Sequence, residues 1–252
     1  MPTLHLQDIH LTRGNTPVFT GLQLQLSESR IGLIGNNGAG KTSLLRLLCG
    51  LETPARGQVL IDGQDIHQRD SGRPARQRIG LMFQNPDDQI IFPTVDEELA
   101  LGLPGLKKRE ALQTARDFLA RRGLAAWAGR AISSLSQGQR QHVCWLALLL
   151  AGPATLLLDE PYASLDLPGQ ARLAHDLETA GRQLLVSTHL LEHVRHYPRV
   201  LWLDQGQIRA DGPGPEICAA YEAHVSQLIR AAGPSVQPGD HPPQALPSDP
   251  LS

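Results

Sequence analysis

The apolar positions in the first part of the chain follow two different patterns. Leucine alternates with glutamine over residues 22–26, and Val59 and Ile61 repeat this alternation between two glycines. A period of two is typical of half-buried strands, so we predict an antiparallel sheet in this region. Residues 31–34 instead form a continuous apolar run that enters a glycine-rich loop, and residues 41–49 are predicted to form a helix that ends at the following glycine.

Short buried strands and helices are predicted to alternate along the rest of the chain. The strands are expected at residues 79–83, 155–158, 184–187 and 200–203. This spacing is typical of βαβ units and predicts a mainly parallel sheet. A helical region is expected to be inserted between the first two of these strands, at about residues 85–152. One helix within it carries its apolar residues on a single face and ends near Gly123: Ala111, Leu112, Ala115, Phe118 and Leu119.

Composition narrows the classes of protein that fit this pattern. With 23 Lys plus Arg against 25 Asp plus Glu, the formal charge is -2, so we expect no nucleic-acid partner. The three cysteines are far apart in the sequence, which fits neither a disulfide framework nor a zinc site. The longest apolar stretch, residues 143–151, is too short to span a bilayer, so any work at a membrane requires a partner. Residues 233–252 are rich in Pro, Ser, Gly and Asp and are predicted to be a disordered tail.

The loop after residues 31–34 has the spacing of a phosphate-binding motif. It matches G-x-x-x-x-G-K-S/T directly after a strand and at the start of a helix: Gly35, Asn36, Asn37, Gly38, Ala39, Gly40, Lys41 and Thr42, followed by Ser43. The glycines let successive backbone N–H groups and the helix N-terminus point at the phosphates of ATP. Lys41 adds a positive charge, and the Thr42 hydroxyl is predicted to bind magnesium. The alternative is an ordinary glycine-rich turn.

Two carboxylates follow the apolar strand at residues 155–158. Asp159 and Glu160 are expected at the carboxyl edge of the parallel sheet, where nucleotide sites form. We predict that Asp159 holds the magnesium ion through water, and that Glu160 orients and polarises the water that attacks the γ-phosphate. Taken alone, the segment is also compatible with an acidic loop after a strand.

These motifs, and the others that follow along the chain, occur in the order found in ATP-binding cassette ATPases, which the chain resembles over roughly residues 3–215. The resemblance implies an α/β fold in which a P-loop ATPase core with a mainly parallel sheet carries an antiparallel β subdomain and an inserted helical subdomain. Residues 1–232 would form this cassette domain. It implies an ATPase that uses ATP and Mg²⁺.

Three further side chains receive roles from this resemblance. Gln84 is similar to the Q-loop glutamine, which touches magnesium and the attacking water. Asp166, in Ser-Leu-Asp, resembles the D-loop residue, and His189, after a predicted strand, is similar to the switch histidine that contacts the γ-phosphate.

The segment Ser136, Gln137, Gly138 and Gln139 resembles the signature loop of the family, except that Gln137 stands where glycine is usual. The helix that follows can offer its N-terminal amides, and Ser136 its hydroxyl, to an anion. In this family that anion is the γ-phosphate held by the opposite subunit, so two chains face each other head to tail around two ATP molecules. The resemblance implies either a homodimer or a pair with a related ATPase.

The aromatic ring that family members usually place against adenine, shortly before the second strand, is missing. The stretch is Leu-Thr-Arg-Gly, and Arg13 is the nearest candidate, because a planar guanidinium can stack on a base. We hypothesise that Arg13 replaces the ring. The alternative is a solvated turn residue.

Residues 85–89 and 93–98 are similar to the energy-coupling-factor branch, whose members power vitamin and metal-ion import together with a transmembrane coupling protein and a small substrate-binding membrane protein. This implies a peripheral subunit at the cytoplasmic face of the cell membrane, with the groove beside residues 89–91 receiving a helix of the membrane partner. Biotin-type members are the most similar, with cobalt- or nickel-type members next. The alternative is an ordinary turn and helix start, because acidic residues such as those at 96–98 are favoured at a helix N-terminus by the helix dipole alone.

Two other functions stay open from the sequence. A soluble, non-transport cassette ATPase usually carries a coiled-coil insertion or a second cassette, and this sequence shows neither. A nucleotide-gated regulatory module would bind ATP without useful turnover, and the presence of both Glu160 and His189 argues against it.

Overall fold

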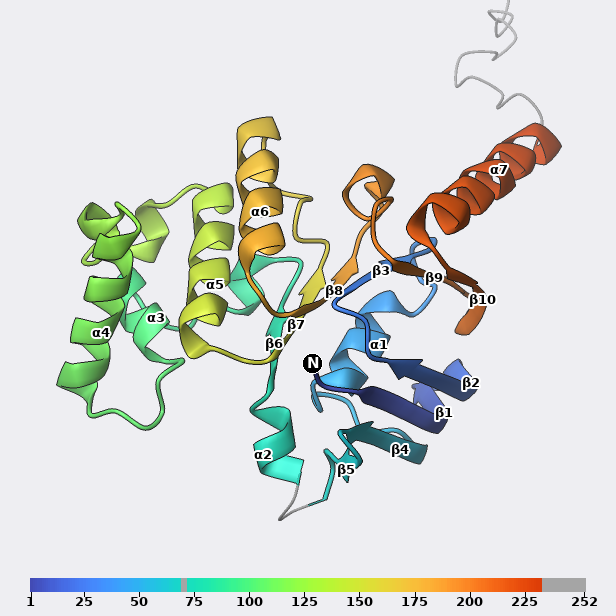
Figure 1. The fold of residues 1–252 in the computed structure, drawn as a ribbon, viewed down its shortest axis with the longest axis horizontal. Coiled ribbons are helices and arrows are strands. Elements are labelled where there is room, and N and C mark those ends of the chain that lie inside the picture. The colour runs from blue at the N-terminus through green and yellow to red at the C-terminus, as the bar shows by residue number, and fades with distance from the viewer. Residues whose placement is uncertain (69–71, 233–252) are drawn as a thin grey trace, which may run out of the picture.

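The computed structural model describes residues 1–68 and 72–232, so the predicted tail at 233–252 lies outside the described residues. A six-stranded sheet in the order β10-β9-β3-β8-β7-β6 forms the centre of the fold (Figure 1). Its strands are β3 (Arg30–Ile34), β6 (Ile79–Met82), β7 (Thr155–Asp159), β8 (Gln183–Ser187), β9 (Arg199–Asp204) and β10 (Gln207–Gly212). Neighbours pair in parallel except β10, which is antiparallel to β9. The parallel strands are therefore confirmed, with ends within one residue of those predicted.

A second, antiparallel sheet has the order β2-β1-β4-β5. Its strands are β1 (Leu4–Arg13), β2 (Thr16–Leu26), β4 (Arg56–Ile61) and β5 (Gln64–Asp65). Leu4 pairs with Leu26, and Leu6 with Leu24, so the alternating leucines of both strands bury one face of this sheet. The predicted antiparallel region is confirmed.

Both faces of the parallel sheet are buried, which explains why its strands are apolar without alternation. On β7, Leu157 packs with the antiparallel sheet and with helix α1 (Lys41–Leu48). Its neighbours Leu156 and Leu158 belong to a separate cluster with α5 (Gln137–Ala151) and α6 (Leu167–Thr179). On β8, Leu185 likewise faces the first cluster and its two neighbours face the second. Successive side chains point to opposite faces of a strand, so a continuous apolar run is needed when both faces are covered.

The helices beyond α1 fall into two groups. Between β6 and β7 lie α3 (Val95–Ala100), α4 (Lys108–Arg121) and α5 (Gln137–Ala151), which share an apolar cluster and stand apart from the antiparallel sheet (Figure 1). The others are α2 (Gly72–Arg76), α6 (Leu167–Thr179) and α7 (Gly214–Ala232). Single 3-10 turns are η1 (Pro86–Asp88), η2 (Ala125–Trp127), η3 (Ile132–Ser134) and η4 (Leu191–His193). The α/β class with its two sheets is confirmed, whereas β10 and α7 were not predicted.

Two further observations bear on function. The carboxyl ends of β3, β7 and β8 are adjacent, because β8 pairs with both of the others, so the loops that follow these strands meet at one edge. Within residues 1–68 and 72–232, no helix is both long enough and apolar enough to cross a membrane.

Candidate nucleotide-binding site

The loop between β3 and α1 curls around the side chain of Lys41. Gly35, Gly38 and Gly40 have φ angles of 146°, 80° and 107°, in the region that favours glycine. The Lys41 side chain lies within this curl, where Nζ donates to the carbonyl oxygens of Gly35 at 2.8 Å and Asn36 at 3.2 Å. Burial lowers the pKa of Lys41, and the charges of the nearby carboxylates oppose that shift. Lys41, only 8% exposed, therefore places a positive charge at the first turn of a helix. A phosphate group binds favourably at such a position.

Thr42 and Asp159 meet at this edge although 117 residues separate them in the chain. The Thr42 Oγ1 donates to Asp159 Oδ2 at 2.7 Å, and Asp159 is the buried last residue of β7. Hydroxyl and carboxylate oxygens suit Mg²⁺, which proteins usually hold through one or two carboxylates together with substrate phosphates. Residues 1–68 and 72–232 contain no group of three or more His, Cys, Asp or Glu side chains able to hold a metal. The Thr42–Asp159 pair offers two oxygen ligands of this kind beside the phosphate loop.

Glu160 and His189 form the second contact between strand ends. Glu160 follows β7 and is 7% exposed, and its Oε2 lies 2.8 Å from His189 Nδ1 and accepts from the His189 backbone N–H at 3.2 Å. Protonated at Nδ1, the imidazole donates to this carboxylate, which fixes the ring and leaves Nε2 facing away from Glu160. Glu160 has a φ of 48°, a left-handed conformation that costs a non-glycine residue roughly 1 kcal/mol. Such strain is typical of functional positions.

The signature-like segment forms the first turn of α5. Ser136 caps the helix, with its Oγ accepting from Gln139 N at 3.3 Å, and Gln139 Oε1 accepts from Ser136 N at 3.0 Å. Gln137, in the position where glycine is usual, donates from Nε2 to the Ser164 Oγ at 2.9 Å. Asp166 caps α6 by accepting from Gly169 N at 2.9 Å. The signature-like and D-loop-like segments are thus joined within one chain.

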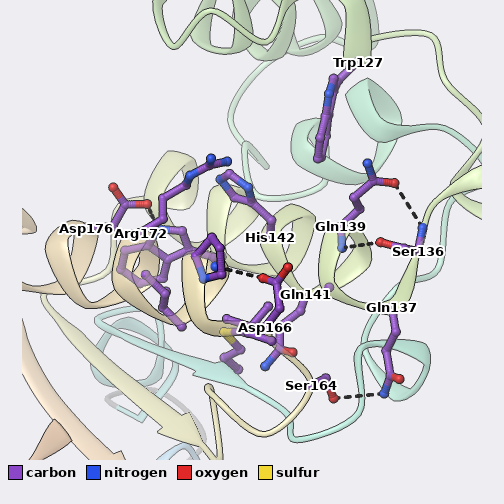
Figure 2. A pocket seen from close by; sticks show the side chains of 17 residues that line it. Trp127, Ser136, Gln137, Gln139, Gln141, His142, Ser164, Asp166, Arg172 and Asp176 are labelled. Carbon is purple, nitrogen blue, oxygen red and sulfur yellow. Dashed lines mark hydrogen bonds between the residues drawn. The ribbon is translucent and has the colours of Figure 1, made fainter.

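These two segments line a cavity of about 560 Å³ between α5 and α6 (Figure 2). Trp127, His142 and Arg172 contribute to its wall, and Figure 2 shows Gln137 reaching toward Ser164 at its rim. None of the described residues of the phosphate loop lines this cavity. The signature-like and D-loop-like segments therefore share a cavity that the phosphate loop does not line.

Two predicted site residues make no contact with this cluster. Arg13, the last residue of β1, forms an ion pair with Glu52, and Arg46 of α1 approaches the same carboxylate at 3.7 Å. Gln84 is exposed in the loop after β6. The roles assigned to both side chains stay predictions.

Two contacts at the site were missed by the sequence analysis. Glutamine at position 137, where glycine is usual, indicated that this position is unusual. The sequence alone could not show that the Gln137 side chain donates a hydrogen bond to Ser164. The hydroxyl of Tyr221, in α7, donates to Asn36 Oδ1 at 2.9 Å across 185 residues, and no motif points to it.

Comparison with known proteins agrees with this geometry. The family model described as ABC transporter matches residues 19–163. The chain is 42% identical over 233 residues to the biotin transport ATP-binding protein BioM of Rhodobacter capsulatus, covering 92% of this chain and 99% of that protein. It is 34% identical to the energy-coupling factor transporter ATP-binding protein EcfA of Methanothermobacter thermautotrophicus, covering 86% and 71%.

A solved structure is also similar. It is that of cbiO1 from Clostridium perfringens, described as part of the ABC transporter complex cbiONQ, and it superposes with a TM-score of 0.73 at 25% identity, covering 91% of this chain and 95% of that one. The family match, the long alignments and the assembled phosphate loop agree. The chain belongs to the ABC transporter family as an ATP-binding, ATP-hydrolysing protein, and its relatives include members of the energy-coupling-factor branch.

Proposed function

We propose that this chain is the ATP-hydrolysing subunit of an energy-coupling-factor importer, held at the cytoplasmic face of the membrane by a transmembrane coupling protein that also carries a substrate-binding protein. The observation that carries the proposal is the site at the sheet edge, where buried Lys41, Asp159 and Glu160 gather with His189 bonded to Glu160. That site stands in a chain that is similar to importer ATPases over most of its length.

Each side chain at the site has a role in ATP hydrolysis. Lys41 binds phosphate oxygens, which replace the carbonyl oxygens of Gly35 and Asn36 as the acceptors of its ammonium group. Thr42 and Asp159 would hold Mg²⁺ together with the phosphates, where the ion would supply positive charge against the charge that develops during phosphoryl transfer. Glu160 positions and polarises the attacking water, and His189, oriented by the Glu160 carboxylate, contacts the γ-phosphate. Gln84 is proposed to contact both the attacking water and Mg²⁺.

A second subunit is part of this proposal. The N-terminus of α5, capped by Ser136, can bind an anion, and the cavity beside it is lined by no residue of the chain's own phosphate loop. A head-to-tail pair would place it against the γ-phosphate held by the other subunit. The partner is a second copy of this chain or a related ATPase.

The contact with the membrane partner is assigned to the loop before α3. Glu98 is 4% exposed, and its Oε2 accepts from the backbone N–H groups of both Ile91 and Phe92 at 2.9 Å. This buried carboxylate fixes the loop so that Ile91, 75% exposed, faces solvent. A rigid loop with an exposed apolar side chain suits an apolar partner helix.

Substitution at this loop tests the coupling. Ile91→Ser should reduce transport in whole cells at least tenfold, because an apolar anchor is lost, while the ATPase activity of the purified chain stays within twofold. Leu228→Ser is the matched control, because it removes an exposed leucine on α7 and should change neither activity. Equal loss of transport and ATP hydrolysis in the Ile91 variant would contradict the assignment.

The substrate is proposed to be biotin, on the similarity to BioM along nearly the whole chain, with cobalt or nickel ions as the second choice. The test is purification from native membranes in mild detergent, followed by mass spectrometry of the proteins and small molecules that accompany the chain. Two small membrane proteins with a vitamin or metal ion would support the importer and identify its cargo. A purely soluble complex would favour a non-transport cassette ATPase, and a complete membrane complex without ATP turnover would favour a regulatory module.

A further inference from the structure

The C-terminal helix contacts the phosphate loop directly. The Tyr221 hydroxyl of α7 donates to Asn36 Oδ1 at 2.9 Å. Asn36 also accepts through its own carbonyl from Lys41 Nζ and from the Ala39 backbone N–H, each at 3.2 Å. One loop residue therefore ties together a distant helix, the ammonium that binds phosphate and the turn that leads into α1.

Tyr221 is itself held firmly in place. Its ring meets that of Trp202 edge to face, with centroids 5.3 Å apart, and Trp202 pairs in register with Ile34, the last residue of β3 before the phosphate loop. Ile217 and Cys218, one turn earlier in α7, are buried against the parallel sheet. The phenol is thus anchored to the same strands that carry the loop.

Two further side chains contact the Trp202 ring. The Arg209 guanidinium lies 4.4 Å from the centre of the Trp202 ring and donates to Asp204 Oδ2 at 2.9 Å, and the His224 ring lies 5.1 Å from Trp202. This arrangement joins β9, β10 and α7. Burial also raises the pKa of the Tyr221 phenol, so the hydroxyl keeps the proton that it donates.

We infer that Tyr221 is a positioning residue of the nucleotide site, which holds Asn36 and thereby the phosphate loop in the curvature that receives ATP. Asn36 is exposed and its side chain has rotational freedom that a bond from a fixed phenol removes. Preorganising a binding loop raises affinity by lowering the ordering cost of binding. The inference rests on ATP binding by the phosphate loop and is independent of the transport proposal.

The test is Tyr221→Phe in the full chain, which removes the hydroxyl and leaves the ring against Trp202. Loss of one hydrogen bond should raise the dissociation constants of AMP-PNP and ADP, measured by titration calorimetry, about three- to tenfold. The KM for ATP should rise by a similar factor with kcat within twofold, and the melting temperature should stay within about 2 °C of the parent. Tyr197→Phe is the control, since Tyr197 is a largely buried tyrosine whose hydroxyl makes no hydrogen bond with the phosphate loop in the part of the chain that the structure describes.

A double-mutant cycle with Asn36→Ala assigns the effect to this bond. Tyr221→Phe should have no further effect on nucleotide affinity in the Asn36→Ala background. Unchanged affinity in the single Tyr221 variant, or additive effects in the double variant, would overturn the inference, as would a fall in melting temperature without a change in affinity. Absence of nucleotide binding by the parent chain would be a different result, because it would overturn ATP binding itself.

Discussion

The shape of the phosphate loop depends on a close approach between Gly35 and strand β9. Gly35 has a φ of 146°, and a Cβ built on it would lie 2.1 Å from the carbonyl oxygen of Leu203 and 3.1 Å from its carbon. Gly38, in the same loop, has a φ of 80° but nothing within 4 Å of the corresponding position. Gly38→Ala therefore measures the free-energy cost of the backbone conformation alone. Gly35→Ala measures that cost together with the steric clash against Leu203.

The two costs differ in size. A left-handed conformation costs alanine about 1–2 kcal/mol, of which about 0.4–1 kcal/mol is recovered because alanine restricts the unfolded chain. Gly38→Ala should thus lower the free energy of unfolding by no more than about 1.6 kcal/mol. Gly35→Ala combines backbone strain of about 1–3 kcal/mol with overpacking of about 1–3 kcal/mol, because a backbone carbonyl in a central strand cannot swing aside. We expect a loss of about 2–5 kcal/mol.

The assay is equilibrium urea unfolding of the full chain without nucleotide, so that contacts of Gly38 with a phosphate do not enter. Gly35→Ala should also weaken ATP binding, since the Gly35 carbonyl is one of the two anchors of Lys41 Nζ. If both variants unfold within about 1 kcal/mol of each other, the loop relaxes away from Leu203 freely, and the reasoning from close approach is wrong.

Three further outcomes are expected. Arg13→Ala should raise the Kd for ATP about two- to fivefold if the guanidinium stacks on adenine, with Arg13→Lys only partly restoring affinity, and an unchanged Kd by calorimetry would reject the stacking. A double-mutant cycle of Gln137→Gly and Ser164→Ala should give a coupling of about 0.5–1 kcal/mol in urea unfolding, whereas additivity would mean that the bond contributes nothing in solution. Burial raises the pKa of Cys144 to about 12, so iodoacetamide at pH 8 should label this thiol only after unfolding, and labelling of the native chain, located by peptide mass spectrometry, would contradict its burial.

The sequence predicted the elements that repeat a simple pattern. The strands of the parallel sheet could be placed because they are buried on both faces, and the alternating leucines predicted the antiparallel sheet. β10 alternates exposed and half-buried residues without a strong apolar stripe, and α7 projects an exposed outer half that includes Leu228 and Ile229. Edge elements of this kind are specified by packing on one side only, so they carry a weaker local pattern.

The positions of the candidate site residues were predictable where they depend on the backbone. Motif spacing placed Lys41, Asp159 and Glu160 at one sheet edge, because the carboxyl ends of neighbouring parallel strands must meet there. Side-chain contacts were not predictable in this way. As the alternative reading expected, the acidic residues 96–98 lie in the first turn of a helix, but the hydrogen bonds that Glu98 accepts from two backbone N–H groups of the preceding loop depend on where that loop returns and could not be predicted.

Single side-chain hydrogen bonds, rather than the apolar core, fix the loops that carry the chemistry. Tyr221 holds the phosphate loop at Asn36, Gln137 holds the D-loop-like segment at Ser164, and the carboxylate after β7 holds His189. Each bond contributes about 1 kcal/mol, against a stability of about 5–15 kcal/mol for a folded domain. Even for a domain with a stability of only about 5 kcal/mol, losing one such bond leaves well over 99% of the molecules folded. The same loss changes the population of molecules with a correctly placed loop several-fold. Substitutions at these contacts should therefore change nucleotide affinity or turnover before they measurably change the free energy of unfolding. Gly35→Ala should do the opposite, because it strains the backbone of the loop itself.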